Sequence, residues 1–323
     1  MPDRFRHGVA SFDPCHDRVL LWTLVDGGGP VRWVVGTDED VRHVVAEGQA
    51  TADADTGVVT VDAAGLAPAT TYWYRFEAGD EPSPVGRTRT LPAAGASRLR
   101  IGTTCCARYA QEEFGVYGAL AAADVDVVVH LGDFIYEDAK GDKRPTEPDR
   151  TLFSLDDYRT RHSLHRRDPN LQALHAAHPM VSIWDDHDLA DNAWRDGAKS
   201  HDPDENGPWA ERKLAAIQAH NEFLPKRLAV AGDPATPWRR LDAGDLVSLV
   251  ITETRAHRDQ PVEAHHDIDV DDPDRTILGA EQRRWLLEQA ADPAPAWVVV
   301  VSGTVVSELE FRAPDLLDAA MPE

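Results

Sequence analysis

The sequence contains few cysteines, no long apolar run and a deficit of basic side chains. Its three cysteines among 323 residues, at positions 15, 105 and 106, are too few for a disulfide framework. The longest apolar stretch, residues 296–301, is too short to cross a bilayer. The N-terminus lacks the apolar core of an export signal, so we expect the chain to be cytoplasmic by default.

Lysine and arginine number 33 against 56 acidic residues, which gives a formal net charge of −23. Nucleic-acid-binding proteins draw their affinity for phosphate from lysine and arginine, so this balance argues against a nucleic-acid partner. An anionic small molecule can still bind where metal cations reverse the sign of the local field. The charge therefore directs attention to groups that hold metal ions.

Two compositions meet near residue 93, which predicts two domains. Residues 1–93 contain β-branched and aromatic runs at 19–24 and 31–36, separated by a glycine-rich turn. Tyr72 follows a turn, as in the tyrosine corner of immunoglobulin-like and fibronectin III-like sandwiches. A generic strand with aromatics on one face is the alternative. We expect an N-terminal all-β sandwich over 1–93 and a joint at 91–97.

From residue 97 to residue 323, strands and helices alternate, which predicts an α/β domain. The expected strands cover 98–103, 125–130, 181–184, 246–251 and 297–301, and the expected helices lie near 114–123, 211–223 and 281–289. Four of these strands end in groups that bind metals or move protons. Open α/β sheets bind ligands beyond the carboxyl ends of their strands, so we expect these four ends to form one pocket.

The segment HLGDFIYE, 130–137, follows the second of these strands. Gly132 permits a sharp turn that lets Asp133 project from the strand end, where its two oxygens can bridge two cations. Tyr136 can return as a phenolate ligand of a hard trivalent metal. A capping aspartate and a tyrosine packed in the core are the alternative interpretation.

The segment WDDHD, 184–188, places three carboxylates beside His187 within four positions. Like charges this close raise one another's pKa and are costly without a cation. A solvated acidic turn is the alternative. Asn192 can add a neutral oxygen ligand, whereas Cys106, taken alone, is better interpreted as an inert buried thiol.

Taken together, these segments resemble the PhoD-like alkaline phosphatases of the metallophosphatase superfamily. The resemblance extends along almost the whole chain in a fixed order: FRHGVASFDP with VLLWT, CCARY, HLGDFIYE, WDDHDLADN, ERKLAAIQAHNEFLP, AGDLVSLVITETR and LGAEQRRWLL. It implies an α/β/β/α sandwich behind a small β-sandwich domain. It also implies hydrolysis of phosphate mono- or diesters by a metal-activated water.

The resemblance further implies that Cys106, Asp133 and Tyr136 are ligands of Fe³⁺. It assigns Asp133, Asp186 and Asn192 to a neighbouring site that can hold Ca²⁺, and other divalent metals are compatible with it. His187 occupies the position of the superfamily's proton-donating histidine, and Asp186 beside it is the second catalytic candidate. Members of the family are often exported.

Two departures from the family pattern lead to further expectations. Glu253 stands where aspartate is usual, and no Gly-Asp-x-His segment follows before residue 323. We therefore expect the C-terminal part of the sandwich to be missing, leaving apolar surface through which the chain self-associates. The alternative function is an inactive or incomplete remnant that binds a partner or needs another chain. A helical HD-type phosphohydrolase built on His187 and Asp188 is disfavoured by the β-rich run before that pair.

Overall fold

The β-branched and aromatic runs of the first 90 residues form eight short strands. The computed structural model describes residues 3–262, 269 and 272–306, so the end of the predicted second domain lies outside the described residues. A short 3-10 helix, η1 (Asp3–Phe5), precedes the strands. The strands are β1 (Val9–Phe12), β2 (Arg18–Leu24), β3 (Gly29–Gly36), β4 (Val44–Ala52), β5 (Val58–Ala64), β6 (Thr71–Ala78), β7 (Glu81–Pro82) and β8 (Gly86–Arg89).

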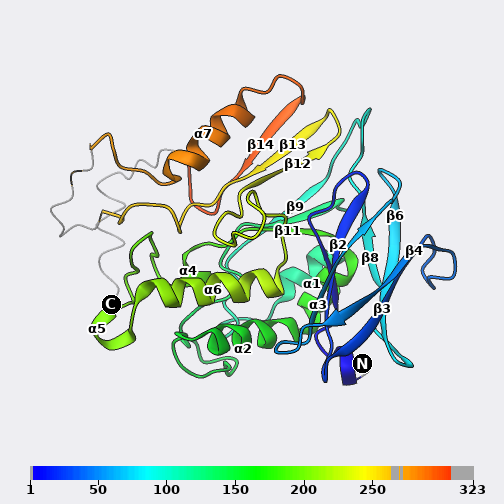
Figure 1. Cartoon of the computed structure of the whole chain (residues 1–323), viewed down its shortest axis with the longest axis horizontal. Helices are drawn as coiled ribbons and strands as arrows, with labels where there is room; N and C mark the ends of the chain where they lie inside the picture. Colours follow the sequence, from blue (N-terminus) through cyan, green and yellow to red (C-terminus); the bar gives the residue numbers. More distant parts are fainter. Residues whose placement is uncertain (1–2, 263–268, 270–271, 307–323) are drawn as a thin grey trace.

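These eight strands fall into two groups that share one apolar core (Figure 1). One group has the order β4-β3-β6-β7, with β8 beside β6, and the other has the order β5-β2-β1. The burial of β6 alternates strictly, and Tyr72, Tyr74 and Phe76 point into the core. The backbone N–H of Ala67 donates a hydrogen bond of 2.8 Å to Tyr72 Oη, which is the contact that defines a tyrosine corner.

The remaining strands are β9 (Ile101–Thr104), β10 (Val127–His130), β11 (Met180–Ser182), β12 (Arg239–Ala243), β13 (Val247–Ile251) and β14 (Trp297–Val301). The helices are α1 (Gly115–Ala121), α2 (Leu155–Arg166), α3 (Pro169–Ala177), α4 (Asp186–Leu189), α5 (Pro203–Asn206), α6 (Trp209–Phe223) and α7 (Gly279–Ala290). All five strands and all three helices predicted from the sequence beyond residue 97 are present, as β9, β10, β11, β13 and β14 and as α1, α6 and α7.

A sheet crosses the joint that the composition predicts near residue 93. Strand β1 pairs in parallel with β11, with Phe12 opposite Met180, and the complete order is β5-β2-β1-β11-β10-β9. The two predicted domains therefore share one six-stranded sheet. Their division at residue 93 stays a prediction.

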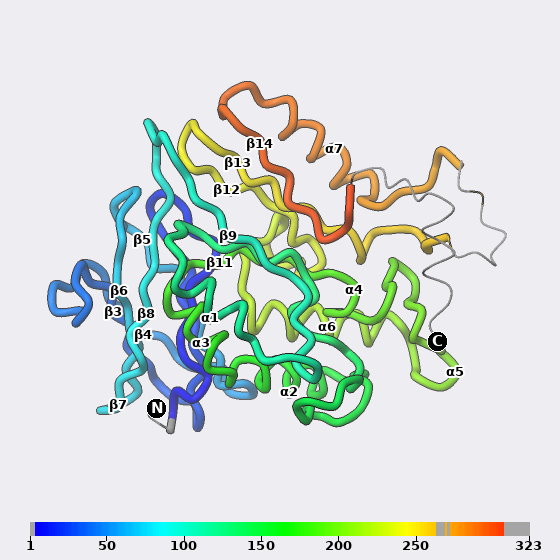
Figure 2. Tube along the Cα trace, turned by 180° about the vertical axis from the view of Figure 1, so that it is seen from behind, coloured from blue at the N-terminus to red at the C-terminus, as the bar shows by residue number. Residues whose placement is uncertain are grey.

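The part of the chain after residue 97 is layered as helices, sheet, sheet and helix (Figures 1 and 2). Helices α1, α2, α3 and α6 cover one face of the six-stranded sheet. Its other face packs against the three-stranded sheet β12-β13-β14 through a second apolar core that includes Val129, Ile183 and Leu249. Helix α7 lies on the outside of β13 and β14.

A buried ion pair joins the N-terminal strands to both sheets of this layered part. Arg239 donates from Nε to Asp13 Oδ2 at 2.6 Å and from Nη2 to Asp13 Oδ1 at 2.7 Å. Arg239 Nη2 also reaches the carbonyl of Ser182 at 3.0 Å. Because a bidentate arginine–carboxylate pair fixes distance and direction, it aligns the end of β1 with β11 and β12.

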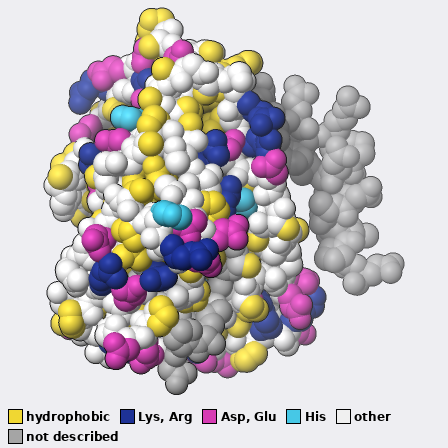
Figure 3. Space-filling view, turned by 90° about the vertical axis from the view of Figure 1, so that its right-hand side faces the viewer, with side chains coloured by type: hydrophobic (Ala, Val, Ile, Leu, Met, Phe, Trp, Pro, Cys, Tyr) yellow, Lys and Arg dark blue, Asp and Glu magenta, His cyan; other side chains and the backbone are white. Residues whose placement is uncertain are grey.

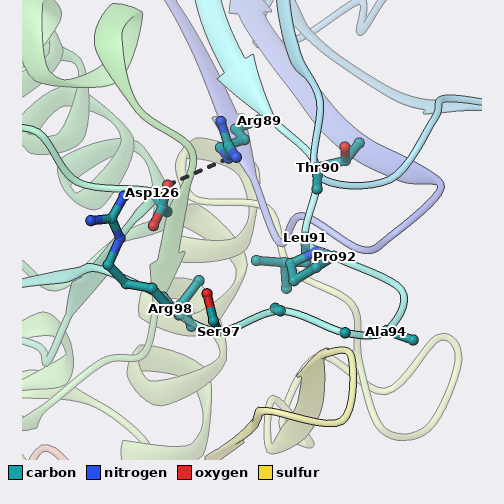
Figure 4. A pocket seen from close by; sticks show the side chains of 12 residues that line it. Arg89, Thr90, Leu91, Pro92, Ala94, Ser97, Arg98 and Asp126 are labelled. Atoms are coloured by element: carbon teal, nitrogen blue, oxygen red, sulfur yellow. Dashed lines mark ion pairs between the residues drawn. The ribbon is translucent and has the colours of Figure 1, made fainter.

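The joint itself borders a polar cavity of about 580 Å³ (Figure 4). Arg89 and Asp126 form an ion pair of 3.4 Å at its wall, and Ser97 and Arg98 line it as well. None of the residues that the sequence predicts as ligands or catalytic groups lines this cavity.

The surface carries both signs of charge despite the acidic composition. On the face drawn in Figure 3, basic and acidic side chains are interspersed. Among the described residues, the helices are all too short or too polar to serve as membrane spans.

Five histidines are buried between the six-stranded sheet and its helices, and burial lowers the pKa of each: His130, His162, His165, His175 and His220. The pKa of His130 falls to about 3. His162 stacks on Phe134 and Phe223, and neither of its ring nitrogens has a hydrogen-bond partner among the described residues. These imidazoles are therefore neutral in the folded chain.

We expect these histidines to make the fold sensitive to acid. A histidine whose folded pKa lies below the unfolded value stabilises fully above about pH 6.5, and this stability is lost as the pH falls because the unfolded chain binds protons. The free energy of unfolding falls between pH 7 and pH 5, and in His162→Leu this fall should be smaller by about 2 kcal/mol. Urea unfolding at the two pH values measures the difference. His16→Leu, at an exposed position, should show the same fall in unfolding free energy between pH 7 and pH 5 as the wild type. An equal acid loss in the His162 variant and the wild type would contradict this account.

Candidate metal centre

Three neighbouring parallel strands deliver their carboxyl ends to the same edge of the six-stranded sheet. Strand β10 lies between β9 and β11, and His130 pairs with Thr104 on one side and with Ser182 on the other. The chain leaves these strands towards Cys106, Asp133 and Asp185. The strand register therefore brings together segments that lie up to 80 residues apart in the sequence.

Cys106, Asp133 and Tyr136 converge on one carboxylate oxygen. Cys106 Sγ lies 3.5 Å from Asp133 Oδ2, and Tyr136 Oη donates to the same oxygen at 3.2 Å. Cys106 and Asp133 have positive φ angles of 58° and 53°, which non-glycine residues rarely adopt. Backbone hydrogen bonds from Cys106 N to the carbonyl of Gly132, at 3.1 Å, and from Ala107 N to the carbonyl of Asp133, at 2.8 Å, hold the two turns against each other.

Carboxylates from two strand ends gather beside this group. Oxygens of Asp133, Asp185 and Asp186 lie within 4.8 Å of one another. Ligand atoms of Asp186, His187 and Asp191 form a second group of the same size. Both groups include Asp186, which the sequence singles out.

Asn192 reaches the centre through its backbone. Its N–H donates to Asp186 Oδ2 at 2.7 Å, and its φ angle is 52°. This contact fixes the orientation of the Asp186 carboxylate. The role of the Asn192 side-chain oxygen as a ligand stays a prediction.

The fourth strand end, after β13, contributes a cation. Arg255 donates to Asp185 from Nε at 2.5 Å and from Nη2 at 3.0 Å, and its Nη2 lies 3.1 Å from Asp186 Oδ1. Glu253, two residues earlier, does not reach the carboxylates. It accepts hydrogen bonds from the indole of Trp184 at 2.8 Å and from the backbone N–H of Arg255 at 2.6 Å. The Glu253 side chain therefore supports the turn that presents Arg255.

His187 is oriented by a carboxylate that was not singled out from the sequence. Its Nδ1 lies 2.7 Å from Glu137 Oε2, and its ring packs on that of Tyr136 with centroids 4.3 Å apart. Glu137 also accepts from the backbone N–H of Asp191 at 2.8 Å and from Ser200 Oγ at 3.3 Å. Its position at the end of HLGDFIYE, in the same run as Asp133, is the sequence signal that could have identified it.

Asp188, the last carboxylate of WDDHD, has a structural role. It is completely buried and accepts from the backbone N–H groups of Ile135 and Asp185, both at 3.0 Å. These bonds tie the turn after β10 to the turn after β11. In WDDHD, Asp185 and Asp186 thus lie at the centre, whereas Asp188 holds the surrounding turns together.

Desolvation is the largest influence on the pKa of Cys106, Asp133 and Asp185. The Cys106 residue is nevertheless exposed, so the alternative of an inert buried thiol is wrong. Desolvation, with a smaller contribution from Asp133, raises the pKa of Cys106 to about 12. Desolvation and then Asp186 raise the pKa of Asp133, and desolvation raises that of Asp185 to about 7 against the opposing effect of Arg255. For His187, desolvation lowers the pKa, but Glu137 and the nearby aspartates outweigh it and raise the pKa to about 9.

This donor set fits metal ions. A thiol, a phenol and a carboxylate share one focus and are difficult to ionise there on their own, whereas a cation favours the anionic form of each. Carboxylate oxygens and a thiolate are ligands of protein-bound metal ions, and the carboxylate group beside them suits a divalent cation.

The layers and the acidic strand ends are those of a metallophosphatase fold. The chain superposes on purple acid phosphatase PPD1 from yellow lupin (Lupinus luteus) seeds with a TM-score of 0.53 and 13% identity, covering 91% of this chain and 49% of that one. Models of the PhoD-like phosphatase family match residues 101–320, and models of its N-terminal domain match residues 1–92. The chain therefore belongs to the PhoD-like phosphatase family, as the sequence motifs indicate.

Two relatives give the extent of this similarity. The chain is 35% identical over 338 residues to alkaline phosphatase D of Bacillus subtilis (strain 168), covering 95% of this chain and 57% of the relative. A solved structure of PhoD superposes with a TM-score of 0.84 and 35% identity, covering 92% of this chain and 62% of that chain. The chain thus spans about three fifths of the length of these relatives.

We expect Gly132→Ala to disrupt the centre. Gly132 has a φ of 111°, and a Cβ there would lie 2.5 Å from Asp185 Cβ and 2.6 Å from Asp185 N. The variant should lose about 2 kcal/mol or more of unfolding free energy in urea and bind less metal. Gly65→Ala is the matched control, because Gly65 also has a positive φ, of 79°, but nothing lies within 4 Å of the added Cβ. Equal losses in the two variants would show that the close approach of Asp185 is unimportant.

Proposed function

We propose that the chain hydrolyses phosphate mono- or diesters at the centre built on Asp133. The observation that carries this proposal is the convergence of Cys106 and Tyr136 on Asp133 Oδ2, beside the carboxylates of Asp185 and Asp186. Membership of the PhoD-like phosphatase family supports it, as does the similarity to a protein named alkaline phosphatase D.

The proposed cofactors are Fe³⁺ and Ca²⁺. Cys106, Asp133 and Tyr136 would hold the iron, because a thiolate, a carboxylate and a phenolate are strongly electron-donating ligands. Asp133, Asp186 and Asn192 would contribute to the neighbouring calcium site, because calcium takes several oxygen ligands at flexible geometry. When bound, the cations activate water and stabilise charge on the phosphoryl oxygens.

The protein groups around the centre would supply orientation and a proton. Glu137 engages Nδ1 of His187, which leaves Nε2 as the ring nitrogen free to give a proton to the leaving oxygen. Packing against the Tyr136 ring keeps the imidazole beside the proposed iron ligands. Asp186 Oδ2 accepts from Asn192 N, so its carboxylate is already oriented before substrate arrives.

Asp133→Asn tests the proposal directly. The neutral amide should bind iron more weakly, and the rate on an activated aryl phosphodiester should fall roughly tenfold or more. Tyr136→Phe should remove the visible phenolate-to-iron absorption while leaving the protein folded. Metal analysis, absorption spectra and initial rates measure these effects. Asp62→Asn, whose carboxylate pairs with Arg227 away from the centre, should behave as wild type. Purified chain that takes up no iron and shows no hydrolysis would refute the proposal.

The second candidate is a binding role in which another polypeptide completes the fold. The favouring observation is the apolar surface of β14, the last strand of the sheet β12-β13-β14 in the described part of the chain. Trp297 is 66% exposed and Val300 48% exposed, and Leu287 of α7 is exposed as well. Such patches mark interaction surfaces in soluble proteins.

If this surface binds a second copy, the chain should associate in a concentration-dependent manner. The double variant Trp297→Lys, Val300→Lys should shift the mass measured by light scattering towards the monomer, because buried lysines oppose an apolar interface. Val116→Lys changes a more exposed valine on α1 and should leave association unchanged. A wild-type chain that stays monomeric at high concentration would exclude self-association through β14.

A further inference from the structure

Arg255 occupies an unusual place for a basic residue in a metal centre. Its side chain is buried, and its guanidinium spans the two aspartates nearest the proposed iron ligands. The two contacts differ in kind. Asp185 receives two hydrogen bonds, from Nε and Nη2, whereas Asp186 is approached only by Nη2 at 3.1 Å.

Asp185 is closely packed against neighbouring backbone, so its carboxylate has little room to move away from Arg255 and bind a metal ion. A Cβ at Gly132 would lie 2.5 Å from Asp185 Cβ, and a Cβ at Gly303 would lie 3.2 Å from Asp185 Oδ1. The backbone beyond β14 therefore packs closely against the carboxylate that Arg255 holds. The Arg255–Asp185 pair is the fixed part of this arrangement.

Asp186 is the carboxylate that both the Arg255 guanidinium and a divalent metal ion can bind. Its Oδ2 accepts from Asn192 N at 2.7 Å, and its Oδ1 faces Arg255. Asp186 also belongs to both groups of potential ligand atoms at the centre. A divalent ion that binds Asp133 and Asp186 would therefore meet a carboxylate whose charge the Arg255 guanidinium already offsets at Oδ1.

We propose that Arg255 is a built-in cation that competes with a divalent ion for Asp186 and so sets the calcium affinity of the centre. This inference rests on the proposed function for the identity of the site. Arg255 acts on the charge of Asp133 but forms no hydrogen bond or ion pair with the proposed iron ligands among the described residues, so we expect iron binding to depend on Arg255 much less than calcium binding does. Arg255 stays on Asp185 in either state and releases only Asp186.

Arg258 provides a matched control for charge. It lies three residues further on, with its N–H bonded to the carbonyl of Arg255 at 3.3 Å. The charges of Asp185 and Asp186 act on its guanidinium, but it forms no ion pair within the described part of the chain. Replacing either arginine by glutamine changes the formal net charge from −23 to −24. Only the Arg255 replacement frees a carboxylate oxygen at the centre.

The test is calcium titration by calorimetry on wild type, Arg255→Gln and Arg258→Gln, with iron content measured in parallel. Arg255→Gln should bind Ca²⁺ on the order of tenfold more tightly, because an opposing charge a few ångströms from the ion is removed. Arg258→Gln should change the affinity at most a few-fold, and iron content should be the same in all three. If the glutamine variant fails to fold, Arg255→Met, which keeps the aliphatic stem, provides the same comparison.

Equal or weaker calcium binding by the Arg255 variants would overturn the inference and show that Arg255 orients Asp186 for the ion. The same gain in Arg258→Gln would also overturn it, because the effect would then be one of general charge. Absence of calcium binding in every variant would likewise refute it. The proposed function fails separately, if the wild type takes up no iron and hydrolyses no phosphodiester. The calcium comparison can still be made on such iron-free protein.

Discussion

The requirement to bring several carboxylates together away from water governs the rest of this structure. Asp133, Asp185 and Asp186 lie within 4.8 Å of one another, and burial raises the pKa of Asp133 and of Asp185. Such a group persists only if donors and cations surround it. The chain supplies Arg255 from a second sheet and the backbone N–H of Asn192. The packing of two sheets is therefore needed for the charge balance of the centre as well as for its shape.

The backbone is adapted to the same requirement. Six non-glycine residues in the described chain have a positive φ, and three of them are the candidate ligands Cys106, Asp133 and Asn192. Conformations of this kind cost free energy and persist where the surroundings enforce them. Here the enforcement comes from the hydrogen bonds between the turns after β9 and β10 and from Asp188, which receives N–H groups of two turns. A buried carboxylate outside the ligand set thus helps to hold the strained turns in place.

The sequence was most informative where one physical signal dominated. Continuous apolar runs predicted β10, β13 and β14, and the polar groups after the first strands predicted which side chains would meet. Helix α2 was missed because its buried face carries His162, His165 and Arg166, which resemble a polar surface in sequence, and the buried face of α3 likewise includes Gln172 and His175.

Other features depend on contacts between distant segments. The pairing of β1 with β11 rests on partners about 170 residues apart, which no local pattern encodes. The contribution of Asn192 through its N–H, and that of Glu137 through His187, likewise follow from tertiary geometry. Side-chain type alone therefore predicted several residues that lie together, but not the contacts that hold them in place.

Charge at the centre explains why this acidic chain would need more than one metal ion to attract a phosphate ester. Three carboxylates, a thiolate and a phenolate against the guanidinium of Arg255 leave a formal charge of −4. The neighbouring cations Arg108 and His187 are paired with Asp138 and Glu137 and do not change this sum. The proposed Fe³⁺ reduces this to −1, which still repels an anion, and the proposed Ca²⁺ brings it to +1. The second cation is thus the one that reverses the field. Arg255 contacts Asp186, the carboxylate that the proposed Ca²⁺ would bind. Arg255 would therefore set the Ca²⁺ concentration at which the centre becomes positive enough to attract the anionic substrate.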